Sequence, residues 1–129
     1  SSESTRRYLE IIELLKAEDL IDVVAVQGHS FSTTVPADST KANLDRLAAA
    51  GLPIMVTEMD IDGADDAVQL SEYRRIFPIF WDHPSVIGIT LWGWRPGMWR
   101  TRQGAPLLRP DGSARPSFEW LMEYTGRKK

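Results

Sequence analysis

Three short apolar segments, each ending in polar or aromatic side chains, recur along the chain at intervals of roughly 30 residues. They span Leu20–Val26, Leu52–Val56 and Val86–Trp92, and they are rich in Val and Ile, which is typical of buried strands. Segments with helical periodicity separate them. Strand, helix and strand at this spacing form a unit whose two strands run parallel. The pattern therefore predicts an α/β chain built on a parallel sheet.

Amphipathic helices are predicted before, between and after the three strands, because apolar side chains recur there at the spacing of one helix face. Gly51 is expected to end the second helix, and Pro78 to kink or break the third. A polar loop is expected between His29 and Pro36. The side chains assigned to the core are Tyr8, Ile11, Ile12 and Leu15; Leu44, Leu47 and Ala48; Ala67, Leu70, Tyr73, Phe77 and Phe80; and Phe118, Leu121 and Met122.

The composition narrows the class of protein. The chain has 15 basic and 18 acidic residues and a net charge of −3, which gives no electrostatic reason to expect nucleic acid as a partner. It has no cysteine, which excludes disulfides and thiolate chemistry. No apolar run reaches the length of a membrane span, so no membrane partner is expected. No residue spacing resembles a transition-metal site or a phosphate-binding loop, so we expect neither a metal nor a cofactor.

Chemically useful side chains follow all three predicted strands. In a parallel sheet the carboxyl ends of the strands share one edge, which is where active sites of α/β sheets and barrels lie. Three separate strands that deliver an amide, an imidazole, two carboxylates and indoles to that edge favour a functional site there. The residues concerned are Gln27, His29, Glu58, Asp60, Trp92 and Trp94.

Glu58 and Asp60 carry the most specific expectation. Residues two apart in an extended chain point to the same side, so both carboxylates should lie together at the end of a buried strand. Unpaired buried charge is costly, which favours a chemical role for the pair. Glu58 would be an ionised nucleophile that His29 orients by a hydrogen bond. Asp60 would accept a hydrogen bond from the other ring nitrogen and so fix the tautomer of His29.

A sugar-binding surface is expected beside this pair. Gln27 would contact a bound hydroxyl group, and Trp92 and Trp99 would form a wall for stacking, because aromatic faces match the apolar face of a pyranose. Taken singly, these residues also have structural interpretations: a loop ion pair for Glu58, a hydrogen-bonded loop histidine for His29, and a helix or loop cap for Asp60. One of the alternating Trp92 and Trp94 could be a core side chain. The basic side chains Arg95, Arg100 and Arg102 could line a polar cleft, but the favoured interpretation is a solvated loop face.

Four stretches of the sequence resemble one known family. They are Val26–His29, Leu52–Asp60, Ile89–Gly93 and Pro106–Phe118, and together they are similar to the carboxyl-terminal part of glycoside hydrolase family 10, the endo-β-1,4-xylanases. The most specific is Thr57–Asp60, because the family's nucleophile pattern is Thr-Glu-(Leu or Met)-Asp.

The resemblance implies a (β/α)8 barrel in which these strands are about the sixth to the eighth, with residues 1–129 as the carboxyl-terminal segment of the catalytic domain. It implies Glu58 as the nucleophile of a retaining reaction on xylan, supported by His29 and Asp60. It also implies Gln27, Trp92 and Trp99 as sugar contacts. The segment Trp94–Trp99 departs from the pattern of many members, which leaves Trp94 either in the core or in the cleft.

One essential group is missing from the chain. A retaining glycosidase needs a second carboxyl group about 5–5.5 Å from the nucleophile, and in the family it follows Asn in an Asn-Glu pair. The only asparagine is Asn43, which precedes Leu44. We therefore expect the chain to be inactive alone and to need the amino-terminal half of the barrel, as a second fragment or a swapped copy. An extracellular or periplasmic location is expected, because xylan is an extracellular polymer.

Three other interpretations remain open at this point. The chain could be a carbohydrate-binding fragment without catalysis that uses Trp92, Trp94 and Trp99. It could belong to another retaining barrel β-glycanase, such as a cellulase or a galactanase. It could also be an inert structural fragment whose carboxylates pair with nearby arginines.

Overall fold

The fold was analysed in a computed structural model that describes residues 2–29 and 36–126. Its three strands form one parallel sheet in the order β1-β2-β3, which confirms the predicted parallel sheet. The polar loop expected after His29 falls largely on residues 30–35, outside the described residues. The elements are α1 (Ser2–Ala17), β1 (Val24–Gly28), α3 (Ala37–Ala48), β2 (Ile54–Met59), α4 (Asp66–Trp81), β3 (Val86–Leu91), the 3₁₀-helix η1 (Thr101–Gln103) and α5 (Pro116–Tyr124).

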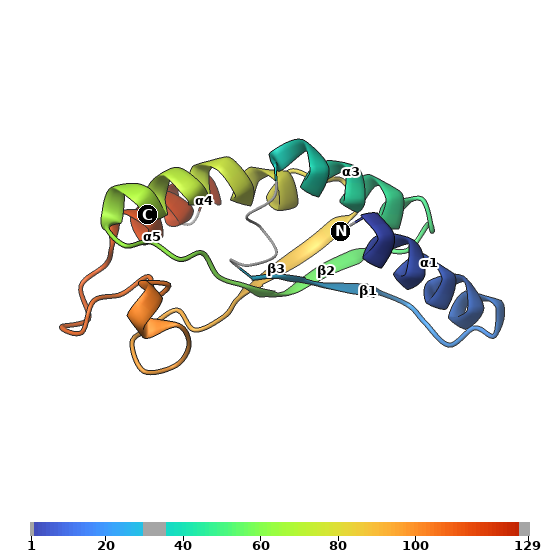
Figure 1. The fold of residues 1–129 in the computed structure, drawn as a ribbon, viewed down its shortest axis with the longest axis horizontal. Helices are drawn as coiled ribbons and strands as arrows, with labels where there is room; N and C mark the ends of the chain where they lie inside the picture. The colour runs from blue at the N-terminus through green and yellow to red at the C-terminus, as the bar shows by residue number, and fades with distance from the viewer. Residues whose placement is uncertain (1, 30–35, 127–129) are drawn as a thin grey trace.

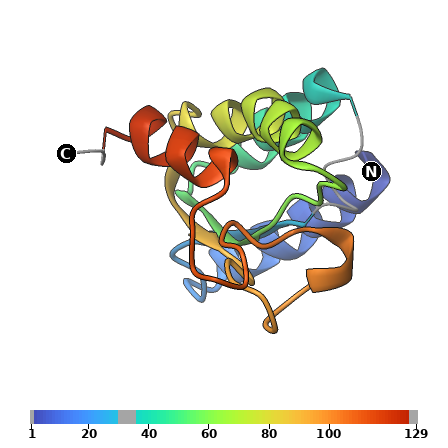
Figure 2. The ribbon, with the colours of Figure 1, turned by 90° about the vertical axis from the view of Figure 1, so that its left-hand side faces the viewer.

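The helices form a layer in chain order beside the sheet. Helix α1 packs against α3, α3 against α4, and α4 against α5. Figures 1 and 2 show α3, α4 and α5 side by side over the strands. The core lies between this layer and the sheet, because strand and helix each bury an apolar face there. It includes Ile12, Val24, Leu44, Ile54, Val56, Met59, Tyr73, Ile76, Phe77, Phe80, Leu107 and Leu121.

Strand β1 begins later than the sequence suggests. Leu20 is 70% exposed, and pairing starts only at Val24, opposite Ile54. The amide of Val24 donates to the carbonyl of Pro53, just before β2 begins. Residues 20–23 therefore lie outside the sheet formed by the described residues, and their apolar content alone does not make them a strand.

Two helical predictions are corrected by the structure. Helix α4 continues through Pro78 without a break. Pro78 lies in the last turn, where a missing amide removes only one helical hydrogen bond, and the flanking Phe77 and Phe80 are buried in the core. Two predicted core residues, Ile11 and Ala67, are exposed instead, and Gln69 is completely buried.

The loop between β2 and α4 and the loop between β3 and α5 are in close contact at the carboxyl edge of the sheet. The amide of Gly63 donates to the carbonyl of Gln103, and a Cβ atom at Gly104 would lie 2.1 Å from the Gly63 carbonyl oxygen. Gly104 also has a φ of +72°, which a glycine adopts without strain. The buried Gln69 amide donates to the carbonyls of Gly104 and Ala105, at 2.9 Å each. These contacts fix the edge on which the candidate site lies.

Candidate active site

The ends of β1 and β2 bring Gln27 and Glu58 together. The register of the two strands shifts between Val26 and Gln27, so that Gln27 pairs with Glu58 instead of Thr57. The Gln27 amide nitrogen donates to Glu58 Oε1 at 3.0 Å. The irregularity matters because an extra residue in one strand re-aims the side chains that follow it. It lets Glu58 present its carboxylate toward β1.

His29 lies between the two carboxylates. Its Nε2 atom is 2.9 Å from Glu58 Oε2, and its Nδ1 atom is hydrogen-bonded to Asp60 Oδ1. His29 and Asp60 are buried, whereas the Glu58 side chain keeps 24% of its surface exposed. A carboxylate accepts and does not donate, so His29 donates from whichever ring nitrogen carries a proton, and its tautomer decides which contact that is. Of the three groups, only Glu58 reaches solvent.

Trp92 and Trp99 flank the imidazole. The ring centroid of Trp92 lies 6.5 Å from that of His29, edge to face, and the centroid of Trp99 lies 5.6 Å away. The two indoles are 43% and 38% exposed. Gly93 permits this packing, because a Cβ atom there would lie 2.3 Å from Trp99 Cβ. The indoles thus border the imidazole ring that contacts Glu58.

A group of charged and polar residues that the sequence did not reveal surrounds Asp60. Arg100 donates to both carboxylate oxygens of Asp62, through Nε at 2.8 Å and through Nη2, and its Nε atom lies 3.9 Å from Asp60 Oδ2. Its hydrogen bond to Asp62 raises the pKa of the Arg100 guanidinium. Tyr73 is completely buried, and burial followed by the nearby Asp60 carboxylate raises the pKa of its phenol.

The predicted solvated face is therefore wrong for Arg100. Its side chain is only 26% exposed and is bound to an aspartate at the end of another strand. The adjacent Trp99 was the one available signal that Arg100 belongs to the site.

The model of glycosyl hydrolase family 10 matches residues 1–124 of the chain. The chain belongs to glycosyl hydrolase family 10.

Relatives within the family include several xylanases. The chain is 38% identical over 119 residues to endo-1,4-beta-xylanase B of Cellvibrio japonicus, covering 90% of this chain and 19% of that protein. It is 31% identical over 121 residues to endo-1,4-beta-xylanase B of Thermotoga neapolitana, covering 84% of this chain and 35% of that protein. An anti-sigma-I factor of Acetivibrio thermocellus is also 35% identical over 109 residues, or 84% of this chain and 13% of its own length.

Solved structures of family 10 share the fold. Xylanase 10B of Thermotoga maritima superposes with a TM-score of 0.72 at 26% identity, over 98% of this chain and 43% of that one. The family 10 structure from Paenibacillus barcinonensis superposes with a TM-score of 0.76 at 22% identity, over 99% of this chain and 44% of that one. The chain thus spans less than half of these relatives. Its parallel strands and alternating helices form part of a (β/α)8 barrel, as the sequence predicted.

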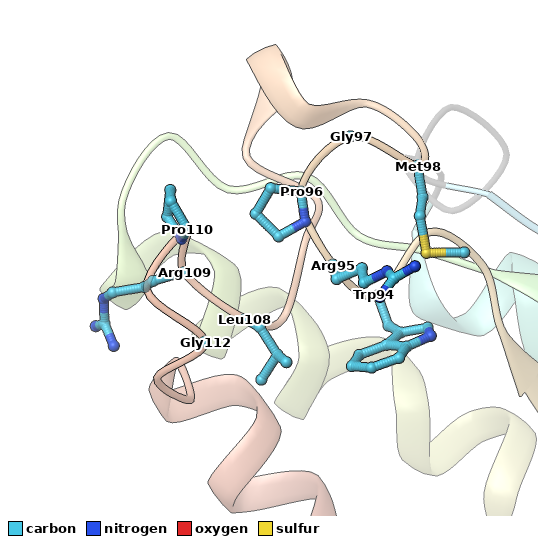
Figure 3. A pocket seen from close by; sticks show the side chains of 9 residues that line it. All are labelled: Trp94, Arg95, Pro96, Gly97, Met98, Leu108, Arg109, Pro110 and Gly112. Carbon is cyan, nitrogen blue, oxygen red and sulfur yellow. The ribbon is translucent and has the colours of Figure 1, made fainter.

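Trp94 is 41% exposed in this family 10 chain. It lines a pocket of about 490 Å³ with residues from both arms of the loop between β3 and α5, among them Arg95, Met98 and Leu108 (Figure 3). The Arg95 guanidinium carbon lies 5.9 Å from the centre of the Trp94 ring.

Neither a metal site nor a membrane helix was found in the described part of the chain. No three His, Cys, Asp or Glu side chains within residues 2–29 and 36–126 are arranged to hold a metal ion. None of the helices in those ranges combines the length and apolar character needed to cross a bilayer.

Proposed function

We propose that this chain supplies the nucleophile of a retaining endo-1,4-β-xylanase, and that Glu58 is that nucleophile. The observation that carries the proposal is the hydrogen-bonded series Asp60–His29–Glu58, whose one partly exposed member is Glu58. Its geometry suits a carboxylate that must be held in one orientation while it attacks. An inert ion pair would not need a buried histidine between two carboxylates.

The reaction would proceed in two displacements. Glu58 attacks the anomeric carbon of the sugar while a second carboxyl group protonates the leaving oxygen, and a glycosyl ester forms on Glu58. Water, deprotonated by that second group, then attacks the same carbon and releases Glu58. His29 would hold Oε2 throughout. In the free chain, the Gln27 amide donates a hydrogen bond to Oε1. On substrate binding, this amide would donate to a sugar hydroxyl instead, which would leave Oε1 free to attack.

The second carboxyl group would come from outside these residues. We infer that the amino-terminal half of the same barrel provides it, either as a separate fragment or as a swapped copy, and that residues 1–129 are inactive alone. The absence of an Asn-Glu pair from the sequence supports this inference. So does the coverage of the relatives, because the chain matches only 35% of the Thermotoga neapolitana enzyme.

The proposed substrate is xylan or xylo-oligosaccharides. The names of several relatives support it, and the half-exposed Trp92 and Trp99 offer apolar faces against which sugar rings could stack. An extracellular or periplasmic location would follow from a polymeric substrate and is proposed on that ground alone.

The test is complementation followed by substitution. The chain should show no xylanase activity alone and should gain it when it is co-expressed with the amino-terminal half of its parent barrel. In that reconstituted barrel, Glu58→Gln should lower kcat on xylo-oligosaccharides by at least about a thousandfold, because an amide cannot form the ester. The control Glu119→Gln, on the exposed surface of α5, should change kcat little.

Two results would contradict the proposal. Xylan hydrolysis by the isolated 129 residues would show that no second half is needed. Full turnover by the Glu58→Gln barrel would exclude Glu58 as the nucleophile. Rates on xylan, cellulose and galactan would separate a xylanase from another retaining β-glycanase.

A second candidate is a family 10 chain that binds carbohydrate without hydrolysing it. The similarity to an anti-sigma-I factor favours it, because that relative is named for regulation and not for hydrolysis. Titration calorimetry with xylohexaose would then show binding to a reconstituted barrel that has no measurable turnover, and Glu58→Gln would leave that binding unchanged.

A further inference from the structure

Asp60 has an unusual environment for a charged side chain. It is only 1% exposed, and its Oδ1 atom is bonded to His29. Its other oxygen, Oδ2, is buried and has no hydrogen-bond partner among the described residues. An unsatisfied buried acceptor is destabilising, so the fold should contain something that compensates it.

Arg100 is the basic group that approaches this oxygen. Its Nε atom lies 3.9 Å from Asp60 Oδ2, too far for a hydrogen bond but close enough for an electrostatic attraction. The guanidinium does not close the gap because Asp62 holds it by two hydrogen bonds. Asp62 therefore sets how much of the Arg100 charge Asp60 experiences.

The backbone at Arg100 is also held in a costly conformation. Its φ and ψ of 44° and 38° lie in the left-handed region, which side chains other than glycine rarely adopt. Its carbonyl accepts hydrogen bonds from the amides of Gln103 and Ala105. Retaining arginine where glycine would be unstrained favours a role for the side chain.

We propose that Arg100 is a positioning residue for Glu58, which it influences through Asp60 and His29. Its charge offsets that of Asp60 and thereby limits how firmly His29 holds the proton shared with Glu58. Without Arg100, the bare Asp60 carboxylate would stabilise the imidazolium, and His29 would bind Glu58 more tightly. The catalytic consequence rests on the proposed role of Glu58 as nucleophile, but the effect on the shared proton does not.

The same loop carries a sugar contact and this charge. Trp99, the residue before Arg100, packs 5.6 Å from the His29 ring, and Arg100 binds Asp62, which follows β2.

The charged or titratable groups around the Asp60–His29 pair are Glu58, Asp62, Tyr73 and Arg100, with Arg115 acting on Tyr73. Among them Arg100 is the cation closest to Asp60 that the structure records.

The test follows the His29 ring by nitrogen NMR in the reconstituted barrel. Glu58, His29 and Asp60 form one hydrogen-bonded unit, so the ring signal reports on all three groups. Arg100→Gln should raise the pH at which this unit loses its shared proton by about one unit, because a positive charge nearby is lost. Arg100→Lys keeps the charge and should shift that pH much less. Arg102→Gln, an exposed change in the same loop, is the matched control and should not shift it.

A further variant guards against loss of folding. Arg100→Gly removes the charge and relieves the left-handed backbone, so it should fold even if Arg100→Gln does not, and it should shift the titration upward as well. An unchanged titration in a folded Arg100→Gln or Arg100→Gly barrel would overturn the proposal. So would an equal shift in Arg102→Gln.

Turnover by the same samples separates the two proposals. An upward shift in Arg100→Gln with no xylanase activity in any sample would leave the role of Arg100 standing and refute the proposed function. A turnover unaffected by Arg100→Gln, with the titration also unchanged, would refute the role of Arg100 and leave Glu58 as the nucleophile.

Discussion

At the scale of single residues, the site depends on one histidine that bridges two acids. His29 contacts Asp60 through Nδ1 and Glu58 through Nε2. Burial of His29 and Asp60 keeps water from competing for these bonds, whereas Glu58 remains partly exposed. An arrangement of this kind holds the Glu58 carboxylate in a fixed orientation without covering it.

Asp60→Asn tests this arrangement. The substitution keeps the shape of the side chain but removes the charge that favours a proton on the His29 ring, and it leaves Arg100 facing a neutral amide. We expect kcat of the reconstituted barrel to fall about tenfold to a hundredfold, the range typical when an outer partner that orients a histidine is lost. Asp22→Asn, an exposed change before β1, should leave kcat unchanged. An Asp60→Asn barrel with normal kcat would contradict the orienting role.

At the scale of secondary structure, the carboxyl edge is fixed by contacts between α4, α5 and the loop that joins β3 to α5. Arg115, which precedes α5, donates from Nε to Asp66 Oδ1 at 2.7 Å and from Nη1 to the carbonyl of Pro106 at 3.0 Å. Arg109 bonds the other oxygen of Asp66. Asp66 lies in the first turn of α4, where a negative charge is also favoured by the helix dipole. The loop that carries Trp99 and Arg100 is thereby anchored to two helices.

This anchor should make stability depend on pH. The hydrogen bond from Arg115 holds the pKa of Asp66 below its ordinary value. The stabilisation is therefore complete above the unfolded pKa, about 3.9 for an aspartate, and is lost as the pH falls below it through the folded pKa. Urea unfolding midpoints measured at pH 6 and pH 3 should differ less in Asp66→Asn than in the parent barrel.

Asp111→Asn provides the matched control for that measurement. The pKa of Asp111 is also lowered, but by the hydroxyl and amide of Ser113 within one exposed turn. Its loss should therefore change the pH dependence less than the loss of Asp66. A larger effect at Asp111 than at Asp66 would show that Asp66 does not anchor the two helices.

At the scale of the whole molecule, the chain is part of a barrel and not a closed one. Strand β2 lies between β1 and β3, so each outer strand has one edge without a strand partner in the described part of the chain. Ile87 on β3 is 64% exposed, and Ile11 and Leu14 on α1 are 53% and 70% exposed. Open edges and exposed apolar side chains favour association with further strands and helices.

The isolated chain should therefore self-associate. Sedimentation velocity should show species heavier than 14.6 kDa whose proportion increases with concentration, because unpaired strand edges offer hydrogen bonds to a second copy. Co-expression with the amino-terminal half should replace these species with a single complex. A monodisperse monomer at all concentrations, with a cooperative unfolding transition, would contradict the incomplete barrel.

The sequence predicted the parallel sheet and the side chains at its carboxyl edge, but not all of their contacts. Gln27, His29, Glu58 and Asp60 could be found because each directly follows or ends an apolar strand segment. The ion pair between Arg100 and Asp62 could not be predicted from the sequence. The two residues are 38 positions apart, and neither directly follows an apolar strand segment. The register shift at Gln27, which decides that its amide meets Glu58, is likewise not encoded by a local pattern.

The sequence by itself thus determined the order of strands and helices, the family resemblance and the edge on which the site lies. These follow from apolar periodicity and from the pattern around Glu58, and both signals can be recognised within a short stretch of the sequence. Only the tertiary structure decided that Oδ2 of Asp60 is buried with no hydrogen bond from the described residues, and that Arg100 lies 3.9 Å from it. Burial and charge pairing depend on which distant segments come into contact. A contact between two loops that are far apart in the sequence has no local sequence pattern that would predict it.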